Sequence, residues 1–173
     1  MDIAALLNDK SIKSTDKREQ IANAIRAGEI SVKDIRTAGF DEKKTGIILE
    51  AMESVSRDNS DVVDIEWLSY AEAYISSSSN SLKREAARVV GNIAGLFPDS
   101  LDDSIKMLIE NTKNDGTVVR WGSAYALGRI ILIPKYADSE LFDVLTDLAE
   151  RETESGVKNQ YLGGLKKAKK LKK

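Results

Sequence analysis

The side chains best suited to binding chemistry are arginines and aromatic residues at helical spacing in the second half of the chain. They recur at matching positions four residues apart: Arg84, Arg88, Asn92, Trp121, Tyr125, Arg129, Asn159, Gly163 and Lys167. Residues four apart share one face of a helix. Arginine, tryptophan and tyrosine dominate the binding energy of many protein interfaces. We therefore expect these positions to form one exposed face that binds a protein or a peptide.

A structural interpretation of the same pattern competes with this one. Trp121 and Tyr125 could fill gaps between neighbouring helices, and the arginines could serve only to keep an exposed face soluble. The pattern alone leaves both interpretations open.

Catalysis is disfavoured because the chain contains no histidine and no cysteine. These absences exclude Ser-His-Asp, Cys-His and zinc–thiolate sites, and remove the commonest general base. Carboxylate and lysine chemistry remain possible. Asp61 with Asp64, and Asp102 with Asp103, are paired acids, but we interpret them as helix caps and dipole partners. The expectation is a protein that is not an enzyme and has no metal and no cofactor.

The charge of the chain is uneven. Residues 156–173 contain seven lysines and no acid, so residues 1–155 carry a net charge of −9. Lys166, Lys169 and Lys170 are candidates for anion binding. The alternative is a solvated helix end whose cations favour the helix dipole.

The composition is that of a globular protein, with 42% hydrophobic and 31% charged residues. No apolar run approaches the roughly 18 residues that cross a bilayer. Met1-Asp2-Ile3 lacks the basic and then apolar layout of a signal peptide. We expect a cytoplasmic protein without a membrane span.

A repeated segment indicates which elements position the candidate residues. Residues 82–93 match residues 119–130, which lie 37 positions later, and residues 157–168 match more weakly after a further 38. Gly91 and Gly128 coincide in the first two copies, whereas Lys166 replaces the glycine in the third. Glycine inside a helix costs about 0.5–1 kcal/mol relative to alanine, so its recurrence favours close helix packing.

Each copy follows another amphipathic stretch and a polar joint, which predicts helix–turn–helix units. The first helices of these units are expected over residues 61–75, 101–111 and 139–151. Upstream, residues 31–38 with 41–56, and 2–8 with 15–27, form two degenerate pairs, and Ser31 with Asp34 suggests a capping box. The prediction is one domain over 1–173, with three clear repeats in 61–173 and two degenerate pairs in 1–60.

The segment from Val119 to Ile130 resembles the second helix of a short HEAT repeat of the PBS-lyase-like kind. Its pattern is Val-Arg-x-x-Ser-Ala-x-Ala-Leu-Gly-x-Ile. The resemblance implies an all-α, right-handed solenoid of about five antiparallel helical hairpins, HEAT- or armadillo-like, whose second helices line a concave face. It also implies that Arg120 braces the joint before its helix, with Asp115 as the expected partner.

The resemblance says little about activity, because fold does not determine function. The family includes protein-binding scaffolds, bilin lyase subunits and, remotely, alkylpurine DNA glycosylases. We expect a non-catalytic scaffold or adaptor that binds a protein or peptide on its concave face. The alternative is nucleic-acid binding through the concave arginines and the lysine tail. A glycosylase would present a carboxylate beside aromatic residues, and no carboxylate occupies the nine matched positions. Nothing in the sequence supports a bilin lyase.

Overall fold

The computed structural model describes residues 1–58 and 60–172. All regular elements in these residues are helices, as predicted. In chain order they are α1 (Ile3–Asn8), α2 (Ser14–Arg26), α3 (Val32–Ala38), α4 (Glu42–Asp58), the 3-10 turn η1 (Ser60–Val62), α5 (Ile65–Ile75), α6 (Asn80–Ile93), the 3-10 turn η2 (Ala94–Leu96), α7 (Asp102–Asn111), α8 (Thr117–Ile130), α9 (Pro134–Ala137), α10 (Leu141–Arg151) and α11 (Ser155–Ala168).

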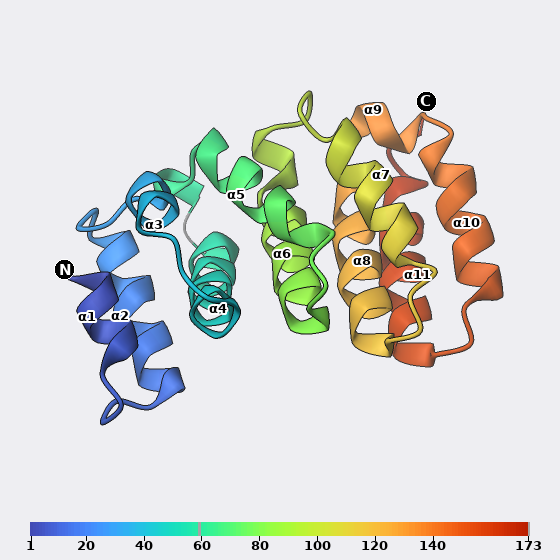
Figure 1. The fold of residues 1–173 in the computed structure, drawn as a ribbon. Coiled ribbons are helices and arrows are strands. Elements are labelled where there is room, and N and C mark those ends of the chain that lie inside the picture. The colour runs from blue at the N-terminus through green and yellow to red at the C-terminus, as the bar shows by residue number, and fades with distance from the viewer. Residues whose placement is uncertain (59, 173) are drawn as a thin grey trace.

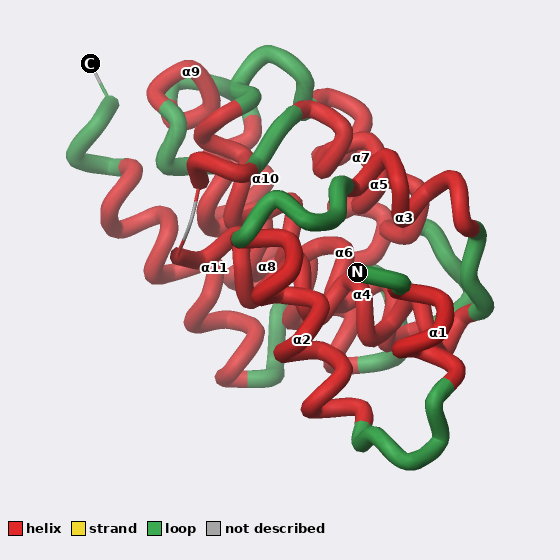
Figure 2. Tube along the Cα trace, turned by 90° about the vertical axis from the view of Figure 1, so that its left-hand side faces the viewer, coloured by secondary structure: helices red, strands yellow, loops and turns green. Residues whose placement is uncertain are grey.

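The helices lie in two layers (Figure 1; Figure 2). In one layer, which we name the second-helix layer, α2, α4, α6, α8 and α11 pack side by side in chain order. The other layer contains α1, α3, α5, α7 and α10, and α3 packs on α5 and α5 on α7. The layers meet where α1 contacts α2, α5 contacts α6, α7 contacts α8 and α10 contacts α11.

Helix starts follow the local sequence signals in part. Ser31 and Asp34 form the predicted capping box, in which each side chain accepts a hydrogen bond from the other residue's backbone N–H. Asp64 caps α5 by accepting a hydrogen bond from the N–H of Glu66. Asp102 and Asp103 do not cap α7, because they lie in its first turn, where their charges favour the helix dipole.

One proline begins a helix. Pro134 is the first residue of α9, a short helix that the repeat pattern did not predict. This position suits proline because the first N–H of a helix has no intrahelical partner. The hydroxyl of Tyr136 in α9 donates to the carbonyl of Pro98, which ties the two proline segments together at 3.0 Å.

Glycine permits the closest approaches within the second-helix layer. A Cβ on Gly91 of α6 would lie 2.8 Å from the Cα of Ala126 in α8. A Cβ on Gly128 of α8 would lie 2.6 Å from the carbonyl oxygen of Gln160 in α11. Both distances are shorter than real contacts allow, so neither site accepts a side chain without movement of the backbone. The close packing predicted from the matched glycines is therefore present.

The third repeat keeps the close approach with a different glycine. The sequence match places Lys166 where Gly91 and Gly128 stand, but the packing position on α11 is Gly164, whose Cβ would collide with the backbone of Gly128. Gly91 and Gly128 each face the next second helix along the chain. α11 packs on α8 and α10, and Lys166 is exposed, so this position on α11 does not require glycine.

Candidate binding face of the second helices

On α6, the candidate residues are half-buried and engaged with acids. The Arg88 guanidinium pairs with Glu53 of α4 at 2.7 Å and with Glu85 of α6 at 2.9 Å. The Nε of Arg84 donates to Glu85 at 2.6 Å. These contacts neutralise both arginines, at positions where the sequence predicted an exposed binding face.

Glu53 and Glu85 are functional candidates that the sequence analysis missed. Their side chains are 4% and 2% exposed, so they lie beneath the arginines rather than on the surface. A signal did exist for Glu85, because it follows Arg84 directly and precedes Arg88 by three residues, within ion-pairing distance on a helix. Glu53 had none, because its partner Arg88 is 35 residues away in the sequence.

These groups line a polar pocket of about 240 Å³ between α2, α4 and α6. Its lining residues are Arg18, Glu50, Glu53, Ser54, Arg57, Arg84, Glu85 and Arg88. Partial burial raises the pKa of Glu50, and the nearby charge of Glu85 raises it further. The pocket therefore contains both signs of charge already in contact with one another.

Asn92, the third candidate on α6, links three second helices. Its side-chain amide donates to the hydroxyl of Ser56 in α4 at 3.0 Å, and its carbonyl accepts a hydrogen bond from the hydroxyl of Tyr125 in α8 at 2.7 Å. Both ends of this carboxamide are used, so Asn92 fixes the position of Tyr125.

The aromatic residues of α8 lie beside the candidate residues of α6. Trp121 and Tyr125 are stacked, with ring centroids 5.4 Å apart. The guanidinium of Arg88 lies 6.0 Å from the Trp121 ring, and that of Arg129 lies 4.3 Å from the Tyr125 ring. These cation–π contacts connect α6 and α8 in the order Arg88, Trp121, Tyr125, Arg129.

The packing interpretation of the aromatic residues is confirmed in part. Trp121 and Tyr125 are half-buried, and Trp121 packs against the hydrophobic core. Each residue therefore takes part in packing between helices and remains partly exposed.

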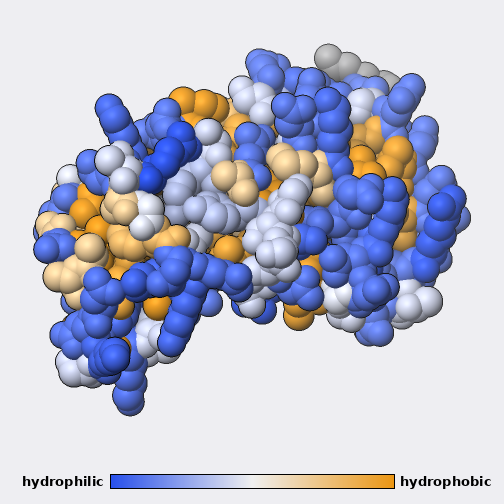
Figure 3. Space-filling view, in the orientation of Figure 1, coloured by the Kyte–Doolittle hydropathy of each residue, from blue (hydrophilic) through white to orange (hydrophobic). Residues whose placement is uncertain are grey.

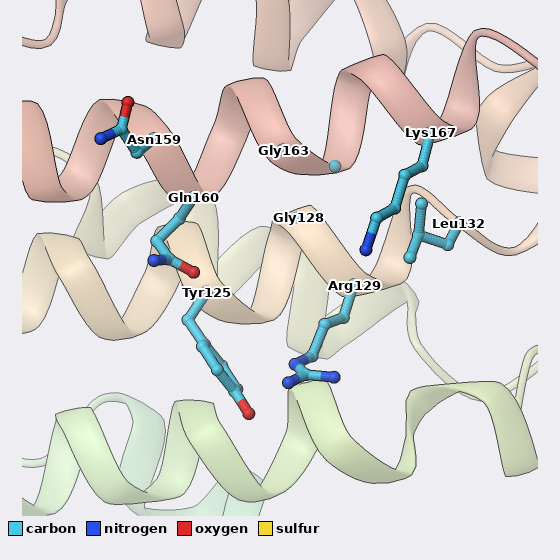
Figure 4. Close-up of a pocket in the computed structure, with 9 residues that line it drawn as sticks. Tyr125, Gly128, Arg129, Leu132, Asn159, Gln160, Gly163 and Lys167 are labelled. Atoms are coloured by element: carbon cyan, nitrogen blue, oxygen red, sulfur yellow. The ribbon is translucent and has the colours of Figure 1, made fainter.

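A groove between α8 and α11 holds most of the remaining candidates (Figure 4). It has a volume of about 190 Å³, and its lining residues are Tyr125, Gly128, Arg129, Leu132, Asn159, Gln160, Gly163, Gly164 and Lys167. Lys167 extends from α11 toward α8, and Arg129 runs from α8 beside Tyr125, whereas the carboxamide of Asn159 points away from α8 (Figure 4). Gly163 leaves the wall of the groove without a side chain.

The lysines at the end of the chain lie on and just beyond α11. Lys166, Lys169 and Lys170 are exposed, and α11 ends at Ala168. The ammonium of Lys172 lies 3.8 Å from the ring centroid of Phe142 in α10, so this lysine is placed by a cation–π contact. Lys173 lies outside the described residues.

Arg120 braces the joint before α8, but its charged partner is not Asp115. The guanidinium pairs with Glu152, in the joint before α11, at 3.0 Å. It also donates to the backbone carbonyls of Asn114 and Asp115 at 2.9 Å and 3.0 Å. The brace therefore joins two successive interhelical turns, and Asp115 takes part through its carbonyl rather than its carboxylate.

Other pockets lie outside this face, one of about 470 Å³ lined in part by Asp102, Tyr136 and Leu141 and one of about 290 Å³ lined in part by Phe40, Tyr70 and Tyr74. The view in Figure 3 is mostly hydrophilic, with apolar atoms in separate patches. Within residues 1–58 and 60–172, no group of three or more potential metal-ligating side chains occurs. In the same residues, no helix has the length and apolar character that crossing a membrane requires.

Comparison with known proteins identifies structural neighbours only. No profile of a known protein family matches the chain, and no curated protein matches it. Two crystal structures of engineered proteins from the Northeast Structural Genomics Consortium are similar over almost their full length. One has a TM-score of 0.58 and 14% identity, covering 99% of this chain and 98% of its own. The other has a TM-score of 0.56 and 12% identity, covering 98% and 99%. At these identities the similarity extends to the fold alone.

Proposed function

We propose that this chain is a non-catalytic scaffold that binds a protein or peptide on the exposed side of its second-helix layer. The proposal includes an architecture of HEAT-like hairpins in a right-handed solenoid. It is supported by the packing of successive second helices in chain order and by the 37- and 38-residue spacing of the repeated segments.

The observation that carries the proposal is the continuous row of Arg88, Trp121, Tyr125 and Arg129 across α6 and α8. These are interface-enriched residue types, and they are held by one another and by Asn92. Side chains that are already ordered lose little entropy on binding, so such a row favours affinity.

Nucleic-acid binding is less well supported than protein binding. A nucleic-acid surface needs many cations facing phosphates. The two candidate arginines of α6, Arg84 and Arg88, instead pair with buried carboxylates. Arg88 lies against the Trp121 ring and pairs with Glu85, whose carboxylate oxygens are occupied by Arg84 and Arg88. Nucleic-acid binding predicts affinity for DNA that falls steeply with salt, whereas the scaffold predicts only weak binding at low salt.

Affinity capture from the native cell tests the proposal. Trp121→Ala and Arg88→Ala are compared with wild type and with two controls in the other layer, Phe142→Ala in α10 and Arg36→Ala in α3. Phe142 is a partly buried aromatic, and Arg36 is an ion-paired arginine, so each control matches its test residue. Circular dichroism establishes that each variant is folded.

The expected result is loss of the same captured protein from both second-helix variants and its retention by both controls. If folded Trp121→Ala and Arg88→Ala both capture every partner at wild-type levels, this face does not bind the partner.

A further inference from the structure

The α6 end and the α11 end of the candidate binding face differ in how their cations are neutralised. Arg84 and Arg88 contact buried carboxylates at 2.6–2.9 Å. Arg129 and Lys167 line the groove between α8 and α11, whose walls contain no acidic side chain. Neither residue has a carboxylate within ion-pairing distance in the described part of the chain. The unneutralised charge of the row is therefore concentrated at this groove.

Arg129 is held in a way that leaves its hydrogen-bond donors available. Its guanidinium contacts the ring of Tyr125 at 4.3 Å, and Asn92 fixes that tyrosine through its hydroxyl. A cation–π contact uses the face of the guanidinium, whereas the N–H donors lie in its plane. The donors of Arg129 are therefore positioned but still free to bind an anion.

The groove supplies a second cation and close access to the backbone. Lys167 reaches across from α11, and Gln160 extends toward Tyr125 (Figure 4). Gly163 has no atom within 4 Å of the position that a Cβ would take, so the groove is open beside it. Arg129 runs from α8 on the side away from α11 (Figure 4), and its Cδ lies 3.4 Å from the position of a Cβ on Gly91 of α6. The residues that line the groove include Arg129 and Lys167 and no acid, so the two cations raise the local potential on this face and attract an anionic group.

We propose that this groove binds the carboxylate side chain of an acidic peptide segment, with Arg129 and Lys167 as the binding residues. The volume of about 190 Å³ is smaller than the roughly 300 Å³ at which small-molecule sites begin, so it fits one side chain. A nucleic-acid strand would need further cations along the row, and those on α6 are already neutralised. The inference rests on the proposed peptide-binding function and names the chemistry of the segment.

A peptide titration followed by NMR tests the site. The probe is hexaglutamate, and the reporters are the backbone amide resonances of Gly163 and Gly164, which lie in the groove. The variants are Arg129→Gln, Arg129→Lys and Lys167→Gln. Lys33→Gln is the control, because it removes one exposed positive charge from α3 in the other layer. Arg129 and Lys167 are exposed, so these variants are expected to fold.

The expected result is a saturable shift of both glycine resonances. Arg129→Gln and Lys167→Gln weaken binding about tenfold each, Arg129→Lys weakens it less, and Lys33→Gln leaves it unchanged. The inference is overturned if neither glycine shifts, if Lys33→Gln weakens binding as much as Arg129→Gln, or if oligothymidylate saturates the same resonances more tightly than hexaglutamate. If the peptide titration gives a negative result while Trp121→Ala loses its captured partner, only the assignment of an acidic peptide is wrong. If the titration gives the expected result while Trp121→Ala captures its partner as wild type does, the proposal that the wider face binds a partner is wrong.

Discussion

At the scale of single residues, the buried acids Glu53 and Glu85 organise the α6 end of the binding face. Burial of an unpaired carboxylate is costly, so each is stabilised only by the arginines around it. Glu53 Oε1 contacts Arg57 at 3.0 Å as well as Arg88 at 2.7 Å. These acids set which arginines of the row are free for a partner.

Replacing Glu85 with glutamine should destabilise the fold. Glutamine has a similar helix propensity, so the change mainly removes the charge that neutralises Arg84 and Arg88. Breaking a buried pair costs about 3–5 kcal/mol, and the partial exposure of the two arginines reduces the expected loss to about 2 kcal/mol. Urea unfolding at neutral pH measures it.

The control is Glu110→Gln, whose ion pair with Lys113 is solvent-exposed on both sides. Its free energy of unfolding should change by about 0.5 kcal/mol or less. Equal stabilities of the two variants would show that Glu85 has no organising role.

Glu152 gives the fold a dependence on acid pH. Burial raises the pKa of this carboxyl, but hydrogen bonds from the N–H of Glu154 and from Arg120 outweigh burial and leave the pKa lowered. A carboxyl with a lowered pKa contributes stability above its unfolded pKa of about 4.3, and that stability is lost as pH falls through the folded value.

Denaturant unfolding of wild type and Glu152→Gln from neutral to acid pH tests this contribution. Wild type should be more stable at neutral pH, and the difference should shrink as the pH falls below about 4. A difference that stays constant over this range would mean that the charge of Glu152 does not contribute.

At the scale of helices, the packing of α8 against α11 depends on which glycine faces the neighbouring helix. Gly163 and Gly164 are adjacent in α11, yet a Cβ on Gly163 meets no atom within 4 Å, whereas one on Gly164 collides with Gly128. Substitutions at these two positions therefore distinguish the effect of helix propensity from the effect of packing between helices.

Gly163→Ala and Gly164→Ala should have opposite effects. Alanine at 163 should stabilise the fold by about 0.5–1 kcal/mol through helix propensity alone. Alanine at 164 should destabilise it by about 1–3 kcal/mol, because α8 and α11 must move apart. Thermal unfolding of both variants checks the signs, and stabilisation of both would contradict the close approach of these helices.

The longer helices were predictable because their signals are local, whereas the short helix α9 was not predicted. Apolar spacing and polar joints placed α7 and α10 within two residues of their observed ends, and Ser31 with Asp34 predicted the start of α3. Side-chain partners between repeats were not predictable. Arg120 pairs with Glu152 and Arg88 with Glu53, over separations of 32 and 35 residues that a single sequence does not connect.

At the scale of the whole molecule, the candidate face changes character from one end to the other. Along α6 the arginines are neutralised by buried acids, in α8 the aromatic rings are stacked, and between α8 and α11 the cations are unpaired within the described residues. The sequence predicted equivalent positions in each repeat. It could not predict this gradient, because the gradient depends on acids that neighbouring helices contribute.

The central claim is that the second-helix layer, rather than the opposite layer, contacts the partner. Hydroxyl-radical footprinting with and without a captured partner tests it most directly, because aromatic side chains report on both layers. Trp121 and Tyr125 report on the second-helix layer, and Phe142 of α10 and Tyr74 of α5 report on the other. The predicted result is reduced labelling of Trp121 and Tyr125 on binding, with Phe142 and Tyr74 unchanged. Protection of Phe142 or Tyr74 with unchanged labelling of Trp121 and Tyr125 would contradict the account.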